Sequence, residues 1–176
     1  DGGVHTVYDL GEWDSHDLAC ELDTGCLTAA TTDLEIATHG PAAALLRTYS
    51  SARTTSGVHA PGWRFGFEQS LNVQASSITY TDAFGQGHVF PRSGSTCTTP
   101  NGFLGQLSAA GSGWRLTFPD QDYLSFDSSG RLTAKTDAGG EQTTYTWAGG
   151  LMTRITAANG QQITLTYSGG KLQSAS

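Results

Sequence analysis

Charge is scarce in this sequence, and positive charge is the scarcer kind. Only 14% of its 176 residues are charged, and nine Lys and Arg stand against sixteen Asp and Glu, for a net charge of −7. A protein that binds a phosphate backbone needs clustered Lys and Arg, whereas the nine here stand singly along the chain. The composition therefore argues against a nucleic-acid partner and, for the same reason, against an anionic membrane surface.

Long apolar runs are also lacking. None approaches the roughly 20 residues that a membrane-spanning helix needs, so we expect no membrane span. No signal peptide stands at Asp1, so we expect a mature product or an excised piece. The few Lys, the many Thr and the low charge favour a secreted or cell-surface setting.

Cysteine is rare, at three residues. The simplest interpretation is a local disulfide between Cys20 and Cys26 in an oxidising compartment, with Cys97 free or bridged elsewhere. Buried free thiols are a second alternative. A metal site built from His16, Cys20 and Cys26 is a third, but zinc sites usually show two close ligand pairs and no second pair is present. We expect no metal and no other cofactor.

No residue pattern predicts a catalytic centre, so we expect the chain not to be an enzyme. The tightest polar cluster holds Asp14, His16 and Asp17, beside Trp13, and a hydrolase would have its site there. Asp120 and Asp122 could form a catalytic carboxylate pair, but two Asp at a turn usually form hydrogen bonds with the local backbone.

Glycine, threonine and aromatic residues are plentiful. The chain has 23 Gly, four Trp, six Tyr and seven Phe, and such a composition favours strands and turns over helices. Ala42–Arg47 has helix propensity but is too short to be stable alone, so we expect a strand there. A turn of helix is expected only within Glu12–Leu22.

The last third of the chain carries an internal repeat of 20 residues. Gly130, Gly150 and Gly170 follow this step, as do Gly140 and Gly160. One aromatic and one aliphatic residue per unit lie in phase with the glycines: Phe126 and Leu132, Trp147 and Met152, and Tyr167 and Leu172. Each unit is therefore predicted to form two strands and two turns.

Residues between these glycines alternate with a period of two, which is typical of half-buried strands. Gln142–Trp147, which contains Tyr145, and Ile163–Tyr167 are the clearest cases. The turns fall at dipeptides that supply positive φ angles: Ser129-Gly130, Gly139-Gly140, Gly149-Gly150, Asn159-Gly160 and Gly169-Gly170. The prediction is an all-β fold, an antiparallel meander of hairpins that forms a twisted, spiralling or partly closed sheet.

The same alternation, less regular, precedes the repeats. It is found at Trp63–Phe67, Ile78–Thr81 and Gly113–Phe118. The chain is accordingly divided into a lead-in (1–26), an irregular β region (27–118) and about three hairpin repeats (119–176).

The repeat resembles that of the Rhs family, also called YD-repeat proteins, which includes bacterial toxin-encapsulating shells and animal teneurins. The family pattern G-R-L-x-x-x-x-D-x-x-G-x-x-x-x-Y-x-Y-D is matched in order by Gly130-Arg131-Leu132, Asp137, Gly140, Tyr145 and Trp147. Phe126-Asp127 stands at the Tyr-Asp position, whereas Trp147-Ala148 and Tyr167-Ser168 lack the Asp. The later units are therefore degenerate, although their spacing is kept.

The preceding region is similar to the one that introduces these repeats in many relatives. The matching stretches are Asp23-Thr24-Gly25, Thr32-Asp33-Leu34, Arg47-Thr48-Tyr49-Ser50 and Pro61-Gly62-Trp63-Arg64. The resemblance implies a long antiparallel sheet that coils into a spiral. In full-length relatives that spiral closes around a C-terminal cargo, often a toxin, and the self-cleaving motif lies beyond the repeats, so neither is expected in this chain.

The leading hypothesis is thus a non-catalytic structural segment of a secreted or surface Rhs-type protein, which builds a β shell that encapsulates or presents a C-terminal toxin or effector. Its partners would be further repeats of the same chain, or a partner protein, at an open sheet edge near Thr166–Ser176. An isolated fragment should then dimerise or aggregate through that edge.

Two alternatives belong to other classes. The first is an extracellular glycan- or protein-binding module that uses the loops 82–87 and 92–102 or the four tryptophans Trp13, Trp63, Trp114 and Trp147. Aromatic rings can stack on sugars, but a Trp that alternates with apolar residues in a strand is usually core. The second is the hydrolase with its site near Asp14 and His16.

Overall fold

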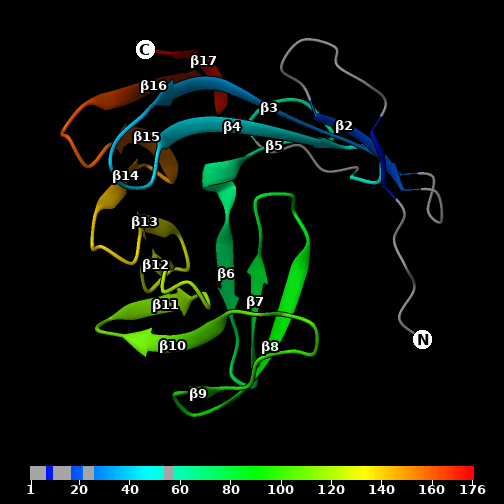
Figure 1. Cartoon of the computed structure of the whole chain (residues 1–176), viewed down its shortest axis with the longest axis vertical. Helices are drawn as coiled ribbons and strands as arrows, with labels where there is room; N and C mark the ends of the chain where they lie inside the picture. The colour runs from blue at the N-terminus through cyan, green and yellow to red at the C-terminus, as the bar shows by residue number, and fades with distance from the viewer. Residues whose placement is uncertain (1–6, 10–16, 22–25, 54–57) are drawn as a thin grey trace.

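The computed structural model of the chain describes residues 7–9, 17–21, 26–53 and 58–176. These residues form seventeen β-strands and one short 3-10 helix, η1 (Gly66–Glu68). The strands make two antiparallel sheets in which the spatial order follows the sequence, so the predicted antiparallel meander is confirmed (Figure 1). Within the described ranges, no helix has the length and apolar character to cross a membrane.

The first sheet has five strands: β1 (Val7–Asp9), β2 (Asp17–Glu21), β3 (Cys26–Ile36), β4 (Ala43–Ser50) and β5 (Trp63–Phe65). The strand predicted at Ala42–Arg47 is confirmed, since it lies within β4 apart from its first residue. The helical turn predicted within Glu12–Leu22 is wrong for Asp17–Glu21, which pairs with β3 as a strand, and the rest of that stretch lies outside the described residues. Pairing to a long neighbour therefore decides the conformation there.

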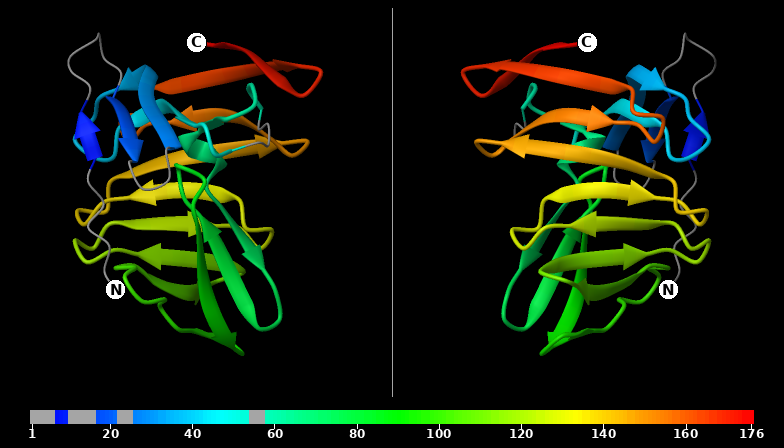
Figure 2. Two further views of the ribbon diagram at one scale, coloured as in Figure 1. Left: turned by 90° about the vertical axis from the view of Figure 1, so that its right-hand side faces the viewer. Right: turned by 90° about the vertical axis from the view of Figure 1, so that its left-hand side faces the viewer.

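The second sheet has twelve strands and is not closed into a barrel. They are β6 (Ser70–Val73), β7 (Ser77–Thr81), β8 (Gly87–Ser93), β9 (Thr96–Cys97), β10 (Gln106–Ala110), β11 (Gly113–Thr117), β12 (Tyr123–Phe126), β13 (Leu132–Thr136), β14 (Gln142–Ala148), β15 (Leu151–Thr156), β16 (Gln162–Ser168) and β17 (Lys171–Ala175). Figure 2 shows β10 to β17 stacked one above another, with β6–β8 crossing them at a steep angle.

This crossing encloses the first of two apolar cores. Leu71, Ile78, Tyr80 and Phe90 from β6–β8 are packed with residues of β10–β13, among them Leu116, and all of the buried members except Trp114 are at most 5% exposed. Because the sheet folds back on itself here, apolar residues from both halves leave water together. The start of the long sheet is therefore a two-layer structure and not a free edge.

The second core lies between the first sheet and the repeat strands of the second sheet. Ala43 and Leu45 of β4 and the two rings of Phe65 and Phe67 pack against a group from the repeats that includes Ile155. The Phe65 and Phe67 rings are stacked at 5.2 Å and 7°. In Figure 1 the long β3–β4 hairpin arches across β14–β16 and covers this part of the structure.

The boundary expected between residues 118 and 119 falls between the paired strands β11 and β12, whereas the change of sheet comes between β5 and β6. The stretch 92–102, expected as a loop, holds the end of β8 and all of β9. The regular part of the sheet thus begins well before the sequence repeat becomes visible.

Candidate functional site

Three sets of contacts join the first sheet, the β6–β8 strands and the repeats to one another, and together we call them the closing contacts. They are made by the tip of the β3–β4 hairpin, by the turn between β7 and β8, and by the start of β6. Because a structural role is the leading hypothesis, they are the candidate functional site.

The tip of the β3–β4 hairpin is anchored on the turn between β13 and β14. Thr143 of β14 is fully buried, and its hydroxyl donates to the carbonyl of Pro41 at 2.5 Å. The backbone comes so close at Gly40 that a Cβ there would lie 2.4 Å from Cβ of Glu141. Glycine at position 40 is therefore a packing requirement, which nothing in the local sequence reveals.

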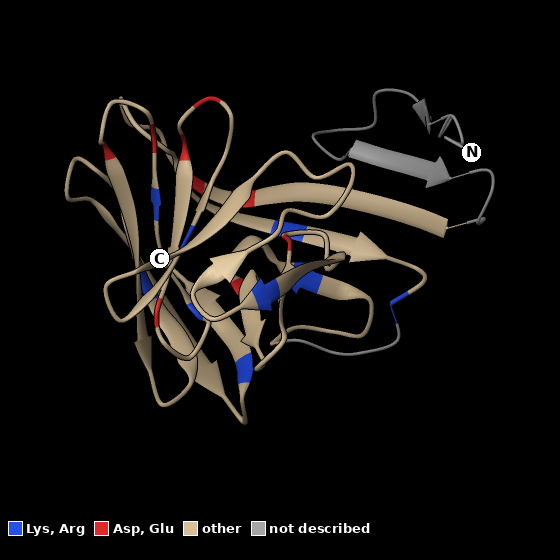
Figure 3. Cartoon of the chain, turned by 90° about the horizontal axis from the view of Figure 1, so that it is seen from below, with Lys and Arg blue, Asp and Glu red and all other residues tan. Residues whose placement is uncertain are grey.

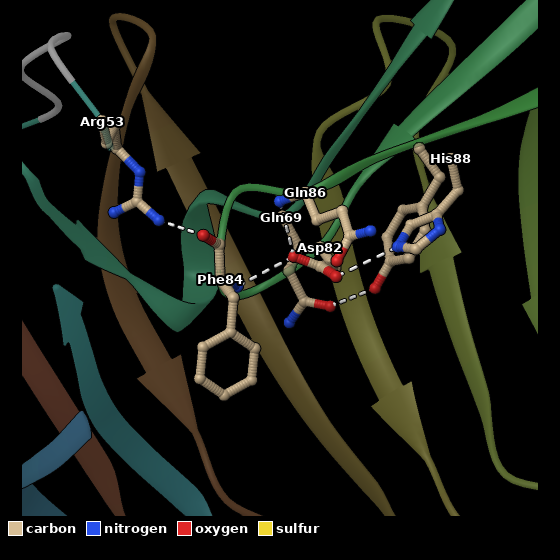
Figure 4. A network of polar contacts seen from close by, with 7 residues as sticks. Arg53, Gln69, Asp82, Phe84, Gln86 and His88 are labelled. Atoms are coloured by element: carbon tan, nitrogen blue, oxygen red, sulfur yellow. Dashed lines mark hydrogen bonds and ion pairs between the residues drawn. The ribbon is translucent and has the colours of Figure 1, made fainter. Parts of the chain in front are cut away.

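The turn between β7 and β8 docks on the first sheet through its backbone carbonyls. The hydroxyl of Thr48 donates to the carbonyl of Ala83 at 2.9 Å, and the Arg53 guanidinium donates to the carbonyl of Phe84 (Figure 4). The same guanidinium also donates to the carbonyl of Gly62 at 3.0 Å. This loop was a candidate binding loop, and two of its carbonyls are engaged within the chain.

The Asp82 side chain stabilises the β7–β8 turn through hydrogen bonds within it. One carboxylate oxygen accepts the backbone N–H groups of Phe84 and Gln86, both at 2.9 Å. The other lies 3.1 Å from Nε2 of His88 (Figure 4), whose ring is 4.6 Å from the ring of Phe103. Both oxygens therefore serve the local structure, as expected for an Asp at a turn.

Beside this turn, Tyr80 is buried and donates its hydroxyl to Oε1 of Gln69 at 2.6 Å. The Gln69 amide in turn donates to the carbonyl of Gly66 at 2.9 Å, which links β7 to the 3-10 helix. Burial raises the pKa of Tyr80, and the nearby charge of Asp82 adds to this rise. The phenol thus stays protonated and acts as a hydrogen-bond donor.

The start of β6 is closed against the first repeat. The N–H of Leu71 donates to the carbonyl of Gly130 at 2.8 Å, and Ser70 forms an isolated β-bridge with Arg131. Gly130 has a φ of +80°, and a Cβ there would lie 1.9 Å from the carbonyl oxygen of Leu71. Glycine is therefore required at position 130 for two reasons: the backbone is left-handed there, and a distant strand approaches too closely for a Cβ atom.

The turn that carries Gly130 is held by Asp127. One of its oxygens accepts the N–H groups of Ser129 and Arg131, both at 2.9 Å, and the other receives the Arg131 guanidinium at 2.7 Å. Burial alone would raise the pKa of this carboxyl, but the bonds and charge of Arg131 outweigh it, so the pKa of Asp127 is lowered. The pair keeps the β12–β13 turn in the shape that β6 meets.

The same five-residue turn occurs five times. In each, the first N–H donates to the fifth carbonyl and the fourth N–H donates to the first carbonyl. The turns span 82–86, 118–122, 127–131, 137–141 and 157–161, and their fourth residues, all with positive φ, are Gly85, Gln121, Gly130, Gly140 and Gly160. Four of the five thus use glycine at the left-handed position, and Gln121 is the exception.

Asp120 and Asp122 lie in one of these turns. Asp120 accepts the N–H of Asp122 at 3.2 Å, and Asp122 accepts the N–H of Ala138 in the turn 137–141 at 3.1 Å. Both line a half-open pocket of about 220 Å³, together with Phe118, Tyr123, Leu124 and Lys135. Each carboxylate bonds backbone, which is the behaviour expected of turn residues.

Each repeat hairpin has a β-bulge directly before its aromatic residue. The register shifts between Ser125 and Phe126, between Thr146 and Trp147, and between Thr166 and Tyr167. After the shift, the aromatic residue pairs with the in-phase aliphatic one: Phe126 with Leu132, Trp147 with Met152 and Tyr167 with Leu172. The three hairpins therefore share the bulge and the aromatic–aliphatic pair that follows it, and the sequence spacing was the signal of the repeat.

The polar atoms of the later aromatics point between repeats. The Trp147 indole N–H donates to the carbonyl of Leu132 at 2.7 Å, and the Tyr167 hydroxyl donates to the carbonyl of Met152 at 2.6 Å. Burial raises the pKa of Tyr167 to about 12, and burial also raises the pKa of Tyr145, which packs against both cores, to about 12. Sequence reasoning missed these bonds because they join residues of different hairpins.

The candidate tryptophans occupy different places. Trp114 is 8% exposed within the first core, which leaves little ring surface for a ligand. Trp147 packs against the second core. Trp63 is half-buried, with the Arg47 guanidinium 4.6 Å from its ring centre and Tyr49 beside it. Trp13 lies outside the described residues, as do Asp14 and His16.

The disulfide prediction falls partly outside the described residues. Cys20 lies in β2, where its backbone pairs with Leu27, but its side chain is not described. The Cys26 sulfur lies 3.3 Å from the hydroxyl of Ser50. Cys97 is a free thiol, and burial raises its pKa. Among the residues that the structure places, no three His, Cys, Asp or Glu gather as a metal site would require.

Positive charge is dispersed in space as it is in sequence. Figure 3 shows the Lys and Arg residues on many separate strands and loops, with acidic residues at several of the loops. Several arginines serve within the fold: besides Arg53, Arg47 pairs with Asp33 and Arg131 with Asp127, both at 2.7 Å. The arrangement is therefore that of a structural protein with locally used charges.

Comparison with known families agrees with this geometry. Residues 126–162 match the family described as RHS Repeat, and residues 20–90 match a domain of unknown function, DUF6531. The chain therefore contains an Rhs repeat, consistent with the resemblance to the Rhs family. No curated protein matches it. The RHS Repeat match begins at the first bulged aromatic, Phe126, and runs through the β12–β13 and β14–β15 hairpins to Gln162, the first residue of β16.

The DUF6531 match covers β3 to β7 and most of β8. Two of the three closing contacts thus run between the two matched stretches, since Pro41 and Leu71 lie in one, and Thr143 and Gly130 in the other. The introducing region and the repeats therefore fold as one unit at this end of the sheet. The chain is an Rhs-type structural repeat protein.

Proposed function

We propose that this Rhs chain builds the closed starting end of a β shell in a secreted or cell-surface protein, and that the shell encapsulates or presents a C-terminal toxin or effector. The observation that carries the proposal is the difference between the two ends of the twelve-stranded sheet. The β6 end is packed and bridged, whereas β17, within the part of the chain that the structure describes, has β16 as its only partner strand.

The closed end supports a capping role. Its first strand, β6, is bonded to the β12–β13 turn, and the β3–β4 hairpin is anchored on Thr143 above it. Edge strands offer unpaired N–H and C=O groups to other chains, and native proteins cover them with loops or short contacts. Covering β6 in this way gives the sheet one direction of growth.

The β17 end supports extension because β17 is the terminal strand of the described sheet and β16 is its partner strand there. The 58–59 segment contacts this strand at its start, where the N–H of Leu172 donates to the carbonyl of Val58 at 3.0 Å and the Lys171 ammonium donates to the carbonyl of His59 at 2.9 Å. The partners are then further repeats of the same chain, or a partner protein, paired with β17 by backbone bonds.

The chain itself is proposed to be non-catalytic, to need no cofactor and to bind no nucleic acid. Support comes from its acidic residues: Asp82, Asp120, Asp122 and Asp127 all bond nearby backbone. A glycan-binding module finds less support, because Trp114 is in the core and the Trp147 indole N–H is bonded internally.

The intact mass of the native gene product tests the proposal. We expect a mass many times the 18.5 kDa of this chain, with the stretch after the repeats protected from protease until the shell is unfolded. A mature chain that ends near Ser176 would overturn the shell, because about three repeats are too few to enclose a cargo. A stoichiometric metal with hydrolytic activity would instead favour the hydrolase.

A further inference from the structure

The two inter-repeat bonds follow one rule. Trp147 donates to Leu132 and Tyr167 donates to Met152, and each bond spans 15 residues from one repeat to the previous one. Leu132 and Met152 are the residues that pair across the bulge with Phe126 and Trp147. A side-chain donor of one repeat thus reaches the same backbone position of the repeat before it, although one donor is an indole and the other a phenol.

The strand ladder explains why a side chain is needed there. Pairing between β15 and β16 begins at Arg154, two residues beyond Met152, and pairing between β13 and β14 begins at Ala134, two residues beyond Leu132. Leu132 and Met152 are at most 1% exposed. A buried carbonyl needs a partner, and the aromatic donor supplies one where the ladder has not yet started.

Phe126, which has no side-chain donor, is consistent with this pattern because no repeat precedes it. The residue 15 positions before it is Gly111, which lies in the turn between β10 and β11, so no repeat precedes Phe126. A ring without a donor suffices at this position, and Phe126 is 3% exposed in the first core. The donor is therefore present in the two repeats that have a repeat before them and absent from the one that has none.

Leu172 is the next position in this series. It pairs with Tyr167 across the bulge as Leu132 pairs with Phe126 and Met152 with Trp147, and it packs against the second core. β17 is the last strand in the order of the long sheet, as far as the described residues go. The carbonyl of Leu172 is thus the acceptor position that a following repeat would meet first.

We propose that the β17 edge selects its partner by this carbonyl: it takes a β-hairpin repeat whose aromatic residue is Tyr or Trp, and the O–H or N–H of that residue donates to the carbonyl of Leu172. The inference rests on the proposed function, because it specifies which strand extends the sheet. A repeat with Phe at this position pairs with β17 less tightly, since the carbonyl is then buried without its donor.

The experiment extends the chain by one repeat. A second copy of residues 157–176 is appended after Ser176, which places the tyrosine of the copy 15 residues beyond Leu172. A matched chain carries Phe in place of that one tyrosine. Folding of the appended repeat is followed by amide hydrogen exchange, and its tyrosine by ultraviolet absorbance as the pH is raised.

With tyrosine, the appended strands should be protected from exchange, and its phenol should titrate near pH 12, as expected for Tyr167. With phenylalanine, the equilibrium constant for docking should fall about fivefold, the usual effect of one hydrogen bond. Tyr167→Phe in the unextended chain should lower the folding constant by a similar factor.

The outcomes separate the two claims. If neither appended copy is protected, β17 is not a growing edge and the proposed function fails together with the inference. If both copies dock equally well and the phenol titrates near pH 10, the edge extends the sheet but the carbonyl of Leu172 selects nothing, and only the inference is overturned.

Discussion

The first repeat hairpin and the two that follow it share a plan and differ in their turns. The β12–β13 turn runs over five residues from Asp127 to Arg131, and β6 lies against it. The later turns, Gly149-Gly150 and Gly169-Gly170, have two residues, both with positive φ, and a Cβ on any of these four glycines would meet nothing within 4 Å. The turn of the first repeat is therefore in contact with a distant strand, whereas the turn glycines of the two later repeats have open space around them.

The difference accounts for the degenerate motif. Asp127 stands at the Asp position of the Tyr-Asp pair and caps the five-residue turn. Its counterparts Ala148 and Ser168 are paired strand residues, opposite Leu151 and Lys171, because the two-residue turns begin one position later. The Asp is kept where the turn has backbone N–H groups for it to accept, and it is absent where the strand supplies their partners.

The largest expected difference in stability is between the variants Gly130→Ala and Gly150→Ala. Both glycines have φ near +80°, so both alanines suffer left-handed strain of about 1–2 kcal/mol. Only at position 130 does the new Cβ also meet a backbone oxygen, 1.9 Å away, so we expect a total loss of about 4 kcal/mol. Urea unfolding of the two variants measures the difference. Equal losses would mean that β6 does not press on this turn.

A second test removes the charge of Asp127. The folded state holds the pKa of this carboxyl below its usual value, so the carboxylate stabilises the fold above about pH 4 and loses that effect as the pH falls through the lowered pKa. Asp127→Asn should cost about 1–2 kcal/mol at pH 7 and progressively less in acid.

Asp137→Asn is the control for that measurement. Asp137 occupies the same turn position, but the fifth residue of its turn is Glu141 where the first repeat has Arg131. We expect a smaller loss at pH 7 from this substitution. A loss at Asp127 that stays constant from pH 7 to pH 3 would contradict the role given to the carboxylate.

The smallest effect is expected at the turn that breaks the glycine rule. Gln121 has a φ of +72°, and Gly140 has a φ of +89° at the same position of an equivalent turn. Gln121→Gly should relieve strain and raise the unfolding free energy by about 0.5–1 kcal/mol after the entropic cost of glycine. Gly140→Gln should act in the opposite direction. Thermal unfolding compares the two, and destabilisation by Gln121→Gly would refute the assignment.

The sequence predicted local features well. Alternation placed β14 and β16, the glycine dipeptides marked turns that have positive φ, and the step of 20 residues identified equivalent hairpins. These succeed because a period of two and a left-handed turn depend on neighbours in the chain. The bulge before each aromatic residue was invisible, since nothing in the alternation marks the shift in register.

The tryptophans show that local alternation does not predict how deeply a strand residue is buried. Trp63, Trp114 and Trp147 all alternate in strands, yet one is half-buried beside Arg47, one lies in the core and one bonds the previous repeat. Which face of a strand is covered depends on what folds over it. That information comes from β6–β8 and from the β3–β4 hairpin, far away in sequence.

The sequence by itself determined the class of fold and the repeat, because strand periodicity, turn chemistry and spacing are properties of short segments. Only the tertiary structure decided that one end of the sheet is closed. Gly40 and Gly130 are ordinary turn glycines in sequence, and what makes them indispensable is the approach of Glu141 and Leu71, residues 101 and 59 positions away. Such contacts form when distant strands pack, so no local pattern records them.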